Sequence, residues 1–455
     1  MLKKITYGLL IAVFFSCSII SRAWSHEDPE KPLEHRIWHL EQTVEQLTNR
    51  LNQQSQEENE TNKTDSEHEV TSAHEPVEVK LNGGIELTAT KKKREFKIRG
   101  LVAANTERFR GAYTSDMQST TIPPDKLGDP AHNSELRSLW VFLSGTVDYD
   151  WKYQMMFDML SGRAIIGSIR YQGFGTSKLT IGKQRETFGL SRFSAGFAGE
   201  ASPVSIRMAP LLGLGIAYSD YHDRFTYGFG IFQQQESDPD LNFDGSEELA
   251  FSARGTWDPI RAPGNLLHIG ASVSRRDFGG GPFQIKSRMG VHTIDDFFPA
   301  QSQEFNADSG NYLGLEAAFV NGPLTLSSEL INIHADEVNQ SITHNFTGYY
   351  LLAGLFLGDY TERYNRKNGR FKRFKPPAGE TAWQVIVRYD ELDLDDKGSG
   401  TKNKGITVGL TWYANRAVRV MSNYTWIDVS GSDAEVIVGD NTTGDTASMR
   451  IQYFF

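Results

Sequence analysis

The segment Ala447–Phe455, with the sequence ASMRIQYFF, decides the fold. Apolar and aromatic residues occupy every second position, and Ser448, Arg450 and Gln452 lie between them. This period of two predicts a β-strand with one apolar and one polar face. A soluble protein gains little from a strand that ends in aromatic residues, whereas aromatic girdles mark both interfaces of outer-membrane barrels. We therefore predict an all-β fold, a transmembrane antiparallel β-barrel.

The same alternation recurs along residues 81–455, without a convincing helical period. The clearest predicted strands cover 139–147, 151–159, 249–257, 267–273, 313–319, 324–330, 383–389, 406–412 and 418–426. A final phenylalanine after such an alternation also resembles the assembly signal of bacterial outer-membrane proteins. Because lipid offers no hydrogen bonds to a sheet edge, a spanning sheet has to close into a barrel.

Composition and length agree with a large barrel. Aromatic residues make up 11% of the 455-residue chain, which argues against general disorder. Beyond residue 25, no apolar stretch approaches the ~20 residues that a spanning helix needs. At roughly 23 residues for each strand with its connection, 81–455 predicts about 16 strands. A barrel of that size encloses an aqueous channel.

The N-terminal residues read as a targeting signal. Two lysines precede an apolar run over 7–20, and Ala23 and Ser25 are small residues at the positions that a signal peptidase recognises. We predict a signal peptide over 1–25. Cys17, the only cysteine, lies inside it, so the mature chain is expected to contain no disulfide.

A helical arm and a linker are predicted before the barrel. Apolar residues recur at steps of four and three at Leu33, Ile37, Leu40, Val44, Leu47 and Leu51. This heptad pattern predicts a coiled-coil helix over 26–54, which asks for partner chains; a single amphipathic helix lying on the body is the alternative. Residues 55–80 are acidic and polar and predict a flexible linker, so the barrel domain is assigned to 81–455.

Several stretches resemble one family, the phosphate-selective porins O and P. The resemblance rests on DYDWKY at 148–153, IGKQRETFGL at 181–190, GLEAAFVNGPL at 314–324, WQVIVRY at 383–389 and TVGLTWY at 407–413. It implies a trimeric 16-stranded porin in which one loop folds inward to form a constriction. It also implies that basic residues in the lumen conduct anions.

Residues near this inward loop are candidates for the constriction. The resemblance places the loop after 182–190, so that Arg192 and Arg207 lie in or near it. An arginine there would offer a planar fork to phosphate oxygens. Lys183 and Arg185 are further candidates, with a role in loop solvation or an interface as the alternative.

The alternation of each strand predicts which charges line the channel. If the apolar face of a strand meets lipid, the opposite face meets water. The basic residues assigned to the lumen by this rule are Lys97, Arg99, Lys152, Arg170, Arg254, Arg388 and Arg419. The acidic residues assigned to it are Asp158, Glu316, Glu329 and Asp390. This excess of basic residues predicts a mild preference for anions, and a balanced general-diffusion lumen is the alternative.

Two further clusters are less specific. Seven basic residues between Arg363 and Lys375 could recruit anions at one mouth or bind lipopolysaccharide, or form a solvated external loop. Asp240, Asn242 and Asp244 match the start of a calcium loop, although Phe251 stands where the closing glutamate belongs. The sequence therefore predicts no confident metal site.

These patterns favour a passive channel in the bacterial outer membrane, with the arm in the periplasm. The expected partners are copies of the chain, membrane lipid and lipopolysaccharide, small anions and peptidoglycan, but not nucleic acid. The sequence lacks G-x-S-x-G, H-E-x-x-H and P-loop motifs, so we predict no enzyme and no cofactor. A structural tether to the cell wall through the arm is the alternative function.

Overall fold

A computed structural model describes residues 77–81, 84–89, 94–114, 130–190, 201–233, 249–294, 297–339 and 341–455. The chain divides into two compact units, 1–74 and 75–455, and the described residues belong to the second. The predicted signal peptide over 1–25, the coiled-coil helix over 26–54 and most of the predicted linker lie outside the described residues.

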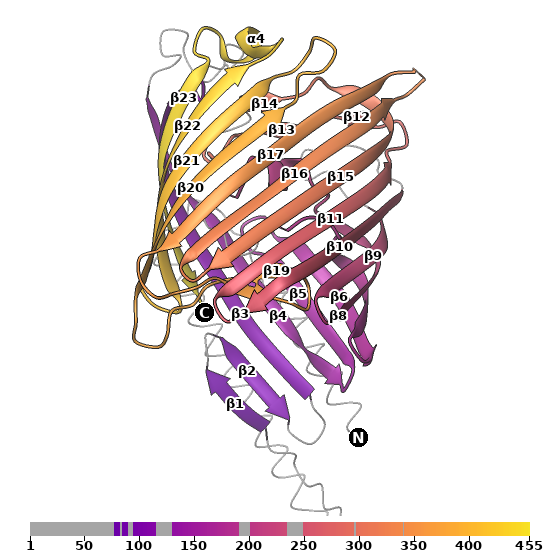
Figure 1. Ribbon diagram of the computed structural model, residues 1–455, viewed down its shortest axis with the longest axis vertical. Helices are drawn as coiled ribbons and strands as arrows, with labels where there is room; N and C mark the ends of the chain where they lie inside the picture. Colours follow the sequence, from indigo (N-terminus) through magenta and orange to yellow (C-terminus); the bar gives the residue numbers. More distant parts are fainter. Residues whose placement is uncertain are drawn as a thin grey trace, which may run out of the picture. The chain divides into compact units, whose positions relative to one another are not determined.

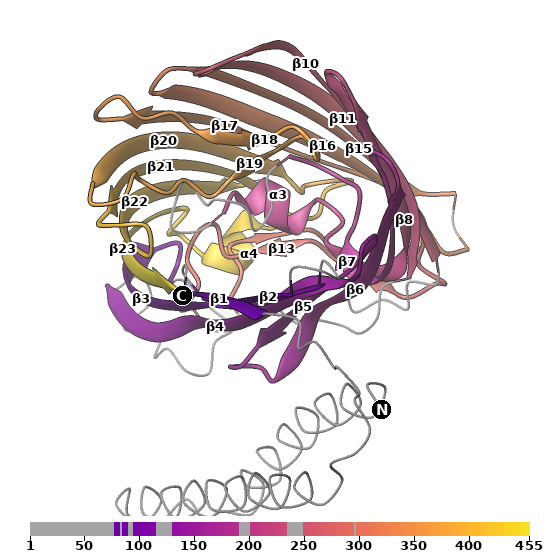
Figure 2. The same ribbon diagram turned by 90° about the horizontal axis from the view of Figure 1, so that it is seen from below.

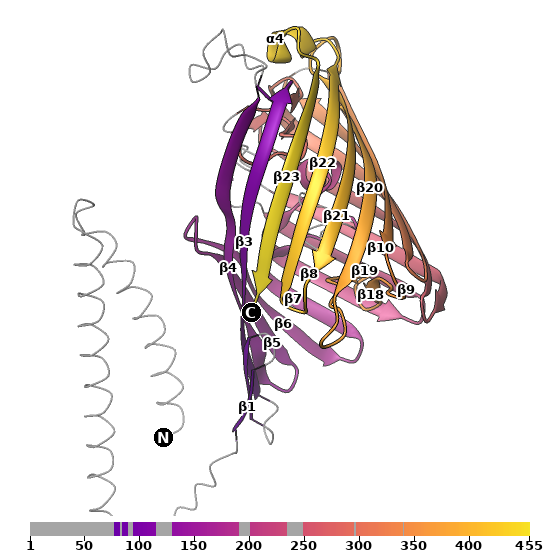
Figure 3. The same cartoon turned by 90° about the vertical axis from the view of Figure 1, so that its left-hand side faces the viewer.

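Sixteen antiparallel strands form a closed barrel within the described residues (Figures 1 and 3). They are β3 (Arg94–Gly111), β4 (Ala131–Asp148), β5 (Trp151–Asp158), β6 (Arg163–Phe174), β7 (Ser177–Arg185), β8 (Leu212–His222), β9 (Phe225–Gln233), β10 (Leu249–Ala262), β11 (Asn265–Asp277), β15 (Phe305–Asn321), β16 (Leu324–Glu337), β17 (Thr343–Phe356), β20 (Ala382–Asp393), β21 (Lys402–Tyr413), β22 (Val418–Ser430) and β23 (Thr443–Phe454). The ring closes where β23 pairs with β3, from Gly444 opposite Gly111 to Phe454 opposite Leu101. The predicted antiparallel barrel and its strand number are confirmed.

Side chains alternate between lipid and lumen as the sequence predicts. On β15, Leu313 and Leu315 are 45% and 48% exposed on the outer face, whereas Glu316 is buried inside. The outer faces of the other strands carry the same kind of exposed aliphatic and aromatic residues, among them Trp383 and Trp412, whose rings stack. This outer surface matches the hydrocarbon and interface of a bilayer.

The two ends of the barrel differ in their connections. At one end, two-residue turns join β4 to β5, β6 to β7, β8 to β9, β10 to β11, and β15 to β16. We call this the short-turn end, and the C-terminus lies there (Figure 1). The long-loop end carries the longer connections 112–130, 186–211, 278–304 and 431–442. In outer-membrane barrels, short turns face the periplasm.

Small elements cover the long-loop end. They are β12 (Pro282–Phe283), β13 (Lys286–Ser287), β14 (Ala300–Gln301) and α4 (Ala434–Val438). Beneath them a buried cluster includes Phe278, Phe283, Phe305 and Phe346. These rings pack the described parts of the loops against the inner wall. No helix among the described residues is long and apolar enough to cross a membrane.

A hairpin precedes the barrel and corrects the predicted domain boundary. Residues Val77–Leu81 (β1) and Ile85–Ala89 (β2) pair with each other, and β2 continues the sheet along the start of β3 (Figure 1). The prediction that 55–80 is a linker is therefore wrong for its last residues. Acidic composition suggested a linker, but Val77 and Val79 alternate with Glu78 and Lys80, which is a strand pattern.

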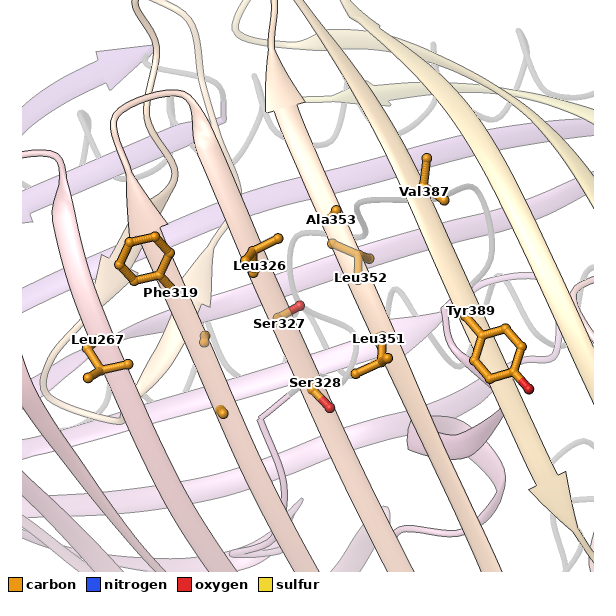
Figure 4. A pocket seen from close by; sticks show the side chains of 12 residues that line it. Leu267, Phe319, Leu326, Ser327, Ser328, Leu351, Leu352, Ala353, Val387 and Tyr389 are labelled. Carbon is orange, nitrogen blue, oxygen red and sulfur yellow. The ribbon is translucent and has the colours of Figure 1, made fainter.

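The outer face carries a shallow apolar groove across β11, β15, β16, β17 and β20 (Figure 4). The small side chains of Ala317, Ser328 and Ala353 form its floor, and Leu326 and Leu351 stand beside them. Because these residues lie on the outward side of their strands, the groove opens toward lipid and not toward the channel.

Candidate functional site: the channel interior

Two segments enter the space enclosed by the barrel. The first, which we call the inward loop, spans 186–211 between β7 and β8 and contains α3 (Pro203–Arg207). The second, which we call the hairpin segment, spans 357–381 between β17 and β20 and contains β18 (Arg363–Asn365) and β19 (Arg370–Lys372). Figure 2 shows α3, β18 and β19 within the ring of strands. Together they narrow the channel.

A buried ion pair fixes the start of the inward loop. Arg276 on β11 donates from Nη1 and Nη2 to the two carboxylate oxygens of Glu186, at 2.9 and 3.0 Å. Ser252 on β10 donates to the same carboxylate at 2.8 Å. Arg276 is 1% exposed and Glu186 is equally buried. A two-pronged arginine contact of this kind sets orientation as well as position.

Further contacts lead the inward loop along the wall from β11 to β20. The backbone N–H groups of Gly189 and Leu190 donate to Ser272 Oγ on β11 and Glu329 Oε1 on β16. Ser202 donates to Asp390 on β20 at 2.5 Å. The described parts of the loop, 186–190 and 201–211, therefore lie against the lumen wall, which is where the family resemblance implies a constriction loop.

The hairpin segment enters from the short-turn end and meets the inward loop. Arg370 donates from Nη2 to the carbonyl oxygen of Phe188 at 2.8 Å. Thr226 on β9 donates to the carbonyl oxygen of Arg366 at 2.8 Å. The interpretation of 363–375 as a solvated external loop is therefore wrong. Its basic, polar composition is that of an exposed loop, and only the fold shows that it turns inward.

Three predicted lumen arginines are inside, and two of them, Arg254 and Arg388, are paired with carboxylates. Arg254 forms a bidentate pair with Glu316 on β15 at 3.1 Å from its Nε. Arg388 donates to Asp390 at 2.6 Å. Arg419 donates to the side-chain oxygen of Gln452 at 2.6 Å. These residues face the channel as predicted, yet two of them act mainly as partners of acidic groups.

Other predicted positions divide between the two faces. Arg99 and Arg170 lie on the lumen side of β3 and β6, with Arg170 donating to Thr180 at 3.2 Å. Lys183 pairs across β7 and β8 with Leu214, which is exposed to lipid, so the prediction that Lys183 lines the pore is wrong. Arg185, the last residue of β7, shares the alternation of Lys183, but it lies close enough to the buried Arg370 of the hairpin segment for its charge to help burial and Arg254 lower the pKa of Arg370.

The remaining predicted residues have these positions. Arg207 ends α3 inside the barrel, in the inward loop. Glu329 faces the lumen, whereas Asp158 accepts hydrogen bonds within the turn that follows β5. Arg192 and the calcium-loop candidates Asp240, Asn242 and Asp244 lie outside the described residues.

A cluster of cations lies on the lumen face of β5 to β7; the sequence interpretation assigned Lys152 and Arg170 to the lumen but missed Lys178 beside them. Lys152 pairs with Arg170 across these strands, and Lys178 lies on the same face. Lys178 and Lys367 of the hairpin segment lie 5.6 and 5.5 Å from the ring centre of Tyr221. We call Lys152, Arg170, Lys178 and Lys367 the first cation cluster. The alternation of Thr180 with Ile181 would have assigned Lys178 to the lumen.

A second group of cations lies at the short-turn mouth. The Arg373 guanidinium lies 3.6 Å from the ring centre of Phe454. Burial, followed by the nearby charges of Arg419 and Arg99, lowers the pKa of Arg373 to about 10. Burial and the Arg373 charge also lower the pKa of Lys375. Cations gathered this closely repel one another and attract anions.

The comparisons with known proteins identify the family. The family model described as phosphate-selective porin O and P matches residues 108–455, which covers most of the barrel. The chain belongs to this family. Its members are porins, which are channels and not enzymes, and they reside in the outer membrane. The resemblance inferred from the sequence motifs is thereby confirmed.

Individual relatives agree with this assignment. Porin O of Pseudomonas aeruginosa is 27% identical over 433 residues, which cover 85% of this porin and 94% of the relative. An uncharacterised protein of Caulobacter vibrioides is 35% identical over 127 residues, which cover 27% of this chain and 25% of that one.

Solved structures share the fold at low sequence identity. The anion-selective porin from Comamonas acidovorans has a TM-score of 0.50 and 13% identity over 80% of this porin and 100% of that chain. The outer membrane channel DcaP of Acinetobacter baumannii has a TM-score of 0.50 and 10% identity over 81% and 99% of the two chains. These similarities concern the barrel architecture.

Proposed function

We propose that this porin conducts small hydrophilic anions in preference to cations, with phosphate among the permeant ions. One observation carries the proposal. Three acidic groups of the lumen, Glu186, Glu316 and Asp390, are each paired with an arginine. By contrast, no carboxylate of the described residues lies within ion-pair distance of Lys152, Arg170 or Lys178. The wall of β5 to β7 therefore carries positive charge that no carboxylate of the described residues compensates by an ion pair.

This uncompensated charge explains the preference physically. A water-filled passage with low-dielectric walls concentrates the potential of its lining charges, so it enriches ions of the opposite sign. Arg170 brings a planar guanidinium that suits two oxygens of a phosphate, and Lys178 brings a compact charge on the same face. Such weak, multiple contacts favour entry without trapping the ion.

The test removes the first cation cluster from the wall. The triple variant Lys152→Gln/Arg170→Gln/Lys178→Gln should lose block of the chloride current by added phosphate, and it should lose part of its chloride preference. Lys183→Gln removes a cation from the outer face and serves as the matched control. If the triple variant and this control have the same phosphate block and reversal potential as the wild type, the proposed anion path is wrong.

We further propose the finer organisation that the sequence suggests. The signal peptide over 1–25 directs export, the coiled coil over 26–54 lies in the periplasm, and three copies assemble. The heptad pattern and the family resemblance support this assembly, while membrane lipid, lipopolysaccharide and peptidoglycan are the proposed surroundings. If tethering to the cell wall is the main function, deleting 33–51 should loosen envelope attachment and leave conductance intact.

A further inference from the structure

The groove on the outer face interrupts a surface of large apolar side chains (Figure 4). Ala317 on β15, Ser328 on β16 and Ala353 on β17 are its small outward residues. Leucine or phenylalanine occupies the outward position before and after each of them: Leu315 and Phe319, Leu326 and Leu330, and Leu351 and Leu355. Three neighbouring strands therefore lack a large side chain at adjacent positions, and the resulting groove has a volume of about 480 Å³.

The groove follows a line of paired residues across the strands. Ala317 pairs with Ser328, Ser328 with Leu351, and Leu351 with Tyr389. Because the strands are tilted, this line rises from Leu267, near the short-turn end of β11, to Tyr389, nearer the long-loop end of β20 (Figure 1).

The length of the groove matches one half of a membrane. Neighbouring strands lie ~4.8 Å apart, so the path from β11 to β20 covers about 19 Å. At a strand tilt of ~40° this path rises by about 12 Å, which is half of the ~25 Å apolar band of an outer-membrane barrel. The groove can therefore hold a chain that reaches from the interface to about the midplane.

The upper end of the groove opens at a pair of tyrosines. The hydroxyl of Tyr389 donates to Oε2 of Glu391 at 2.5 Å, and the hydroxyl of Tyr349 donates to the same oxygen at 2.8 Å. Tyrosine is enriched at membrane interfaces, where its ring meets the hydrocarbon and its hydroxyl meets the headgroups. The polar end of a bound molecule would therefore lie beside Glu391.

An unpaired cation lies at this upper end. Lys404 on β21 is exposed on the outer face and stands opposite Glu391 on β20 and Asp428 on β22. Its ammonium is beyond ion-pair distance of every carboxylate of the described residues. Lys402, by contrast, is paired with Asp393 at 3.0 Å. Lys404 is thus available to a phosphate group at the level of the headgroups.

The shape of the groove favours a single acyl chain over a second barrel. The wall of another copy would be convex, and it would bridge the flanking leucines without reaching the floor at Ala317. A flexible hydrocarbon chain can follow the floor and contact it along its whole length, and such contacts add up. The leaflet at the long-loop end faces outward, where bacterial outer membranes carry lipopolysaccharide, an acylated and phosphorylated lipid.

We propose that this groove binds one acyl chain of lipopolysaccharide and that Lys404 contacts a phosphate of the same molecule. The site lies outside the channel, so the proposal goes beyond ion conduction and does not depend on the anion preference.

The first test fills the groove. Ala317→Leu/Ala353→Leu places large side chains on the floor, and Ala253→Leu/Ala271→Leu is the matched control, because these alanines face outward on β10 and β11 away from the groove. Refolded full-length porin in detergent is titrated with bisphosphorylated lipid A, and bound lipid is counted by native mass spectrometry. Wild type and control should retain one lipid A per chain, and the filled variant should bind it at least tenfold more weakly. Equal binding by the filled variant and the control would overturn the proposal.

The second test changes only the exposed cation. Lys404→Gln should weaken binding of bisphosphorylated lipid A several-fold and leave binding of the dephosphorylated lipid unchanged. Lys183→Gln, on the outer face of β7, is the control and should behave as the wild type. Unaltered binding of the phosphorylated lipid by Lys404→Gln, or an equal loss for both lipids, would contradict the phosphate contact.

Other occupants of the groove give different results. If the filled variant loses assembly of copies while the control retains it, the groove is an interface between copies and the proposal is wrong. If phosphatidylethanolamine displaces lipid A from the wild type at equal concentration, the occupant is a phospholipid and the proposal is also wrong. All of these variants should keep the wild-type reversal potential in a KCl gradient, so the lipid site and the proposed function are tested separately.

Discussion

Breaking the Glu186–Arg276 pair should destabilise the barrel strongly. The substitution Glu186→Gln keeps the size of the side chain but leaves a buried guanidinium, 1% exposed, without its compensating charge. It also replaces one of the two carboxylate oxygens that accept from Arg276 at 2.9 and 3.0 Å with an amide that cannot accept. Removing one partner of a buried pair costs about 3–5 kcal/mol.

The assay is reversible unfolding in urea, with the porin in detergent micelles or lipid vesicles. At an unchanged slope, the free-energy loss should appear as a lower midpoint. Lys402→Gln is the control, because the Lys402–Asp393 pair is 48% and 41% exposed at its side chains and should contribute little.

The size of the loss in unfolding free energy shows whether the ion pair anchors the inward loop. A loss of less than about 1 kcal/mol for Glu186→Gln, similar to an exposed pair, would show that the inward loop is not anchored by this ion pair. Because this pair holds the start of the inward loop, the same variant should also give a noisier channel current.

Three other predictions concern the hairpin segment and the barrel seam. Burial raises the pKa of Glu362 to about 7, so the folded state holds this proton more tightly; stability should fall as the pH rises from about 4.5 to 7. Glu362→Gln should remove that dependence in urea titrations at several pH values, and an unaltered dependence would contradict it. A thiol at Asn368→Cys, the exposed tip, should allow charged thiol reagents to change the chloride preference, the anionic reagent lowering it; unchanged currents after verified labelling would place the tip outside the ion path. Deleting Phe455 removes its hydrogen bonds with Gly100 at 2.7 and 3.1 Å and should lower the yield of closed barrel in refolding assays, whereas a wild-type yield would show that the seam does not need it.

The strands and their faces could be predicted because the alternation is local. Apolar residues mark the lipid face of each strand and polar residues mark its water face. This alternation correctly predicts that Arg254, Arg388 and Arg419 lie inside the barrel. Lys183 was proposed from its closeness to the inward loop, although it alternates in phase with the apolar Ile181. There the strand pattern was the better guide.

The compensation of charges could not be predicted, because it depends on distant contacts. Arg254 and Glu316 are 62 residues apart, and the pairing of β10 with β11 and of β11 with β15 brings them together on the lumen face. The hairpin segment has the composition of a solvated loop, and its inward course depends on Arg254, Thr226 and Phe188, which lie on or near three other strands. Counting lumen charges from the sequence therefore overstated the net positive charge of the barrel wall. It also missed the basic hairpin segment inside the barrel.

The central claim is that this porin forms an open channel with an uncompensated positive lumen. Its most direct test is the reversal potential of refolded wild-type porin in a planar bilayer, under a KCl gradient. The account predicts discrete conductance steps and a reversal potential of the sign given by chloride permeation. A reversal potential of the potassium sign, or the absence of steps from correctly folded barrels, would contradict it.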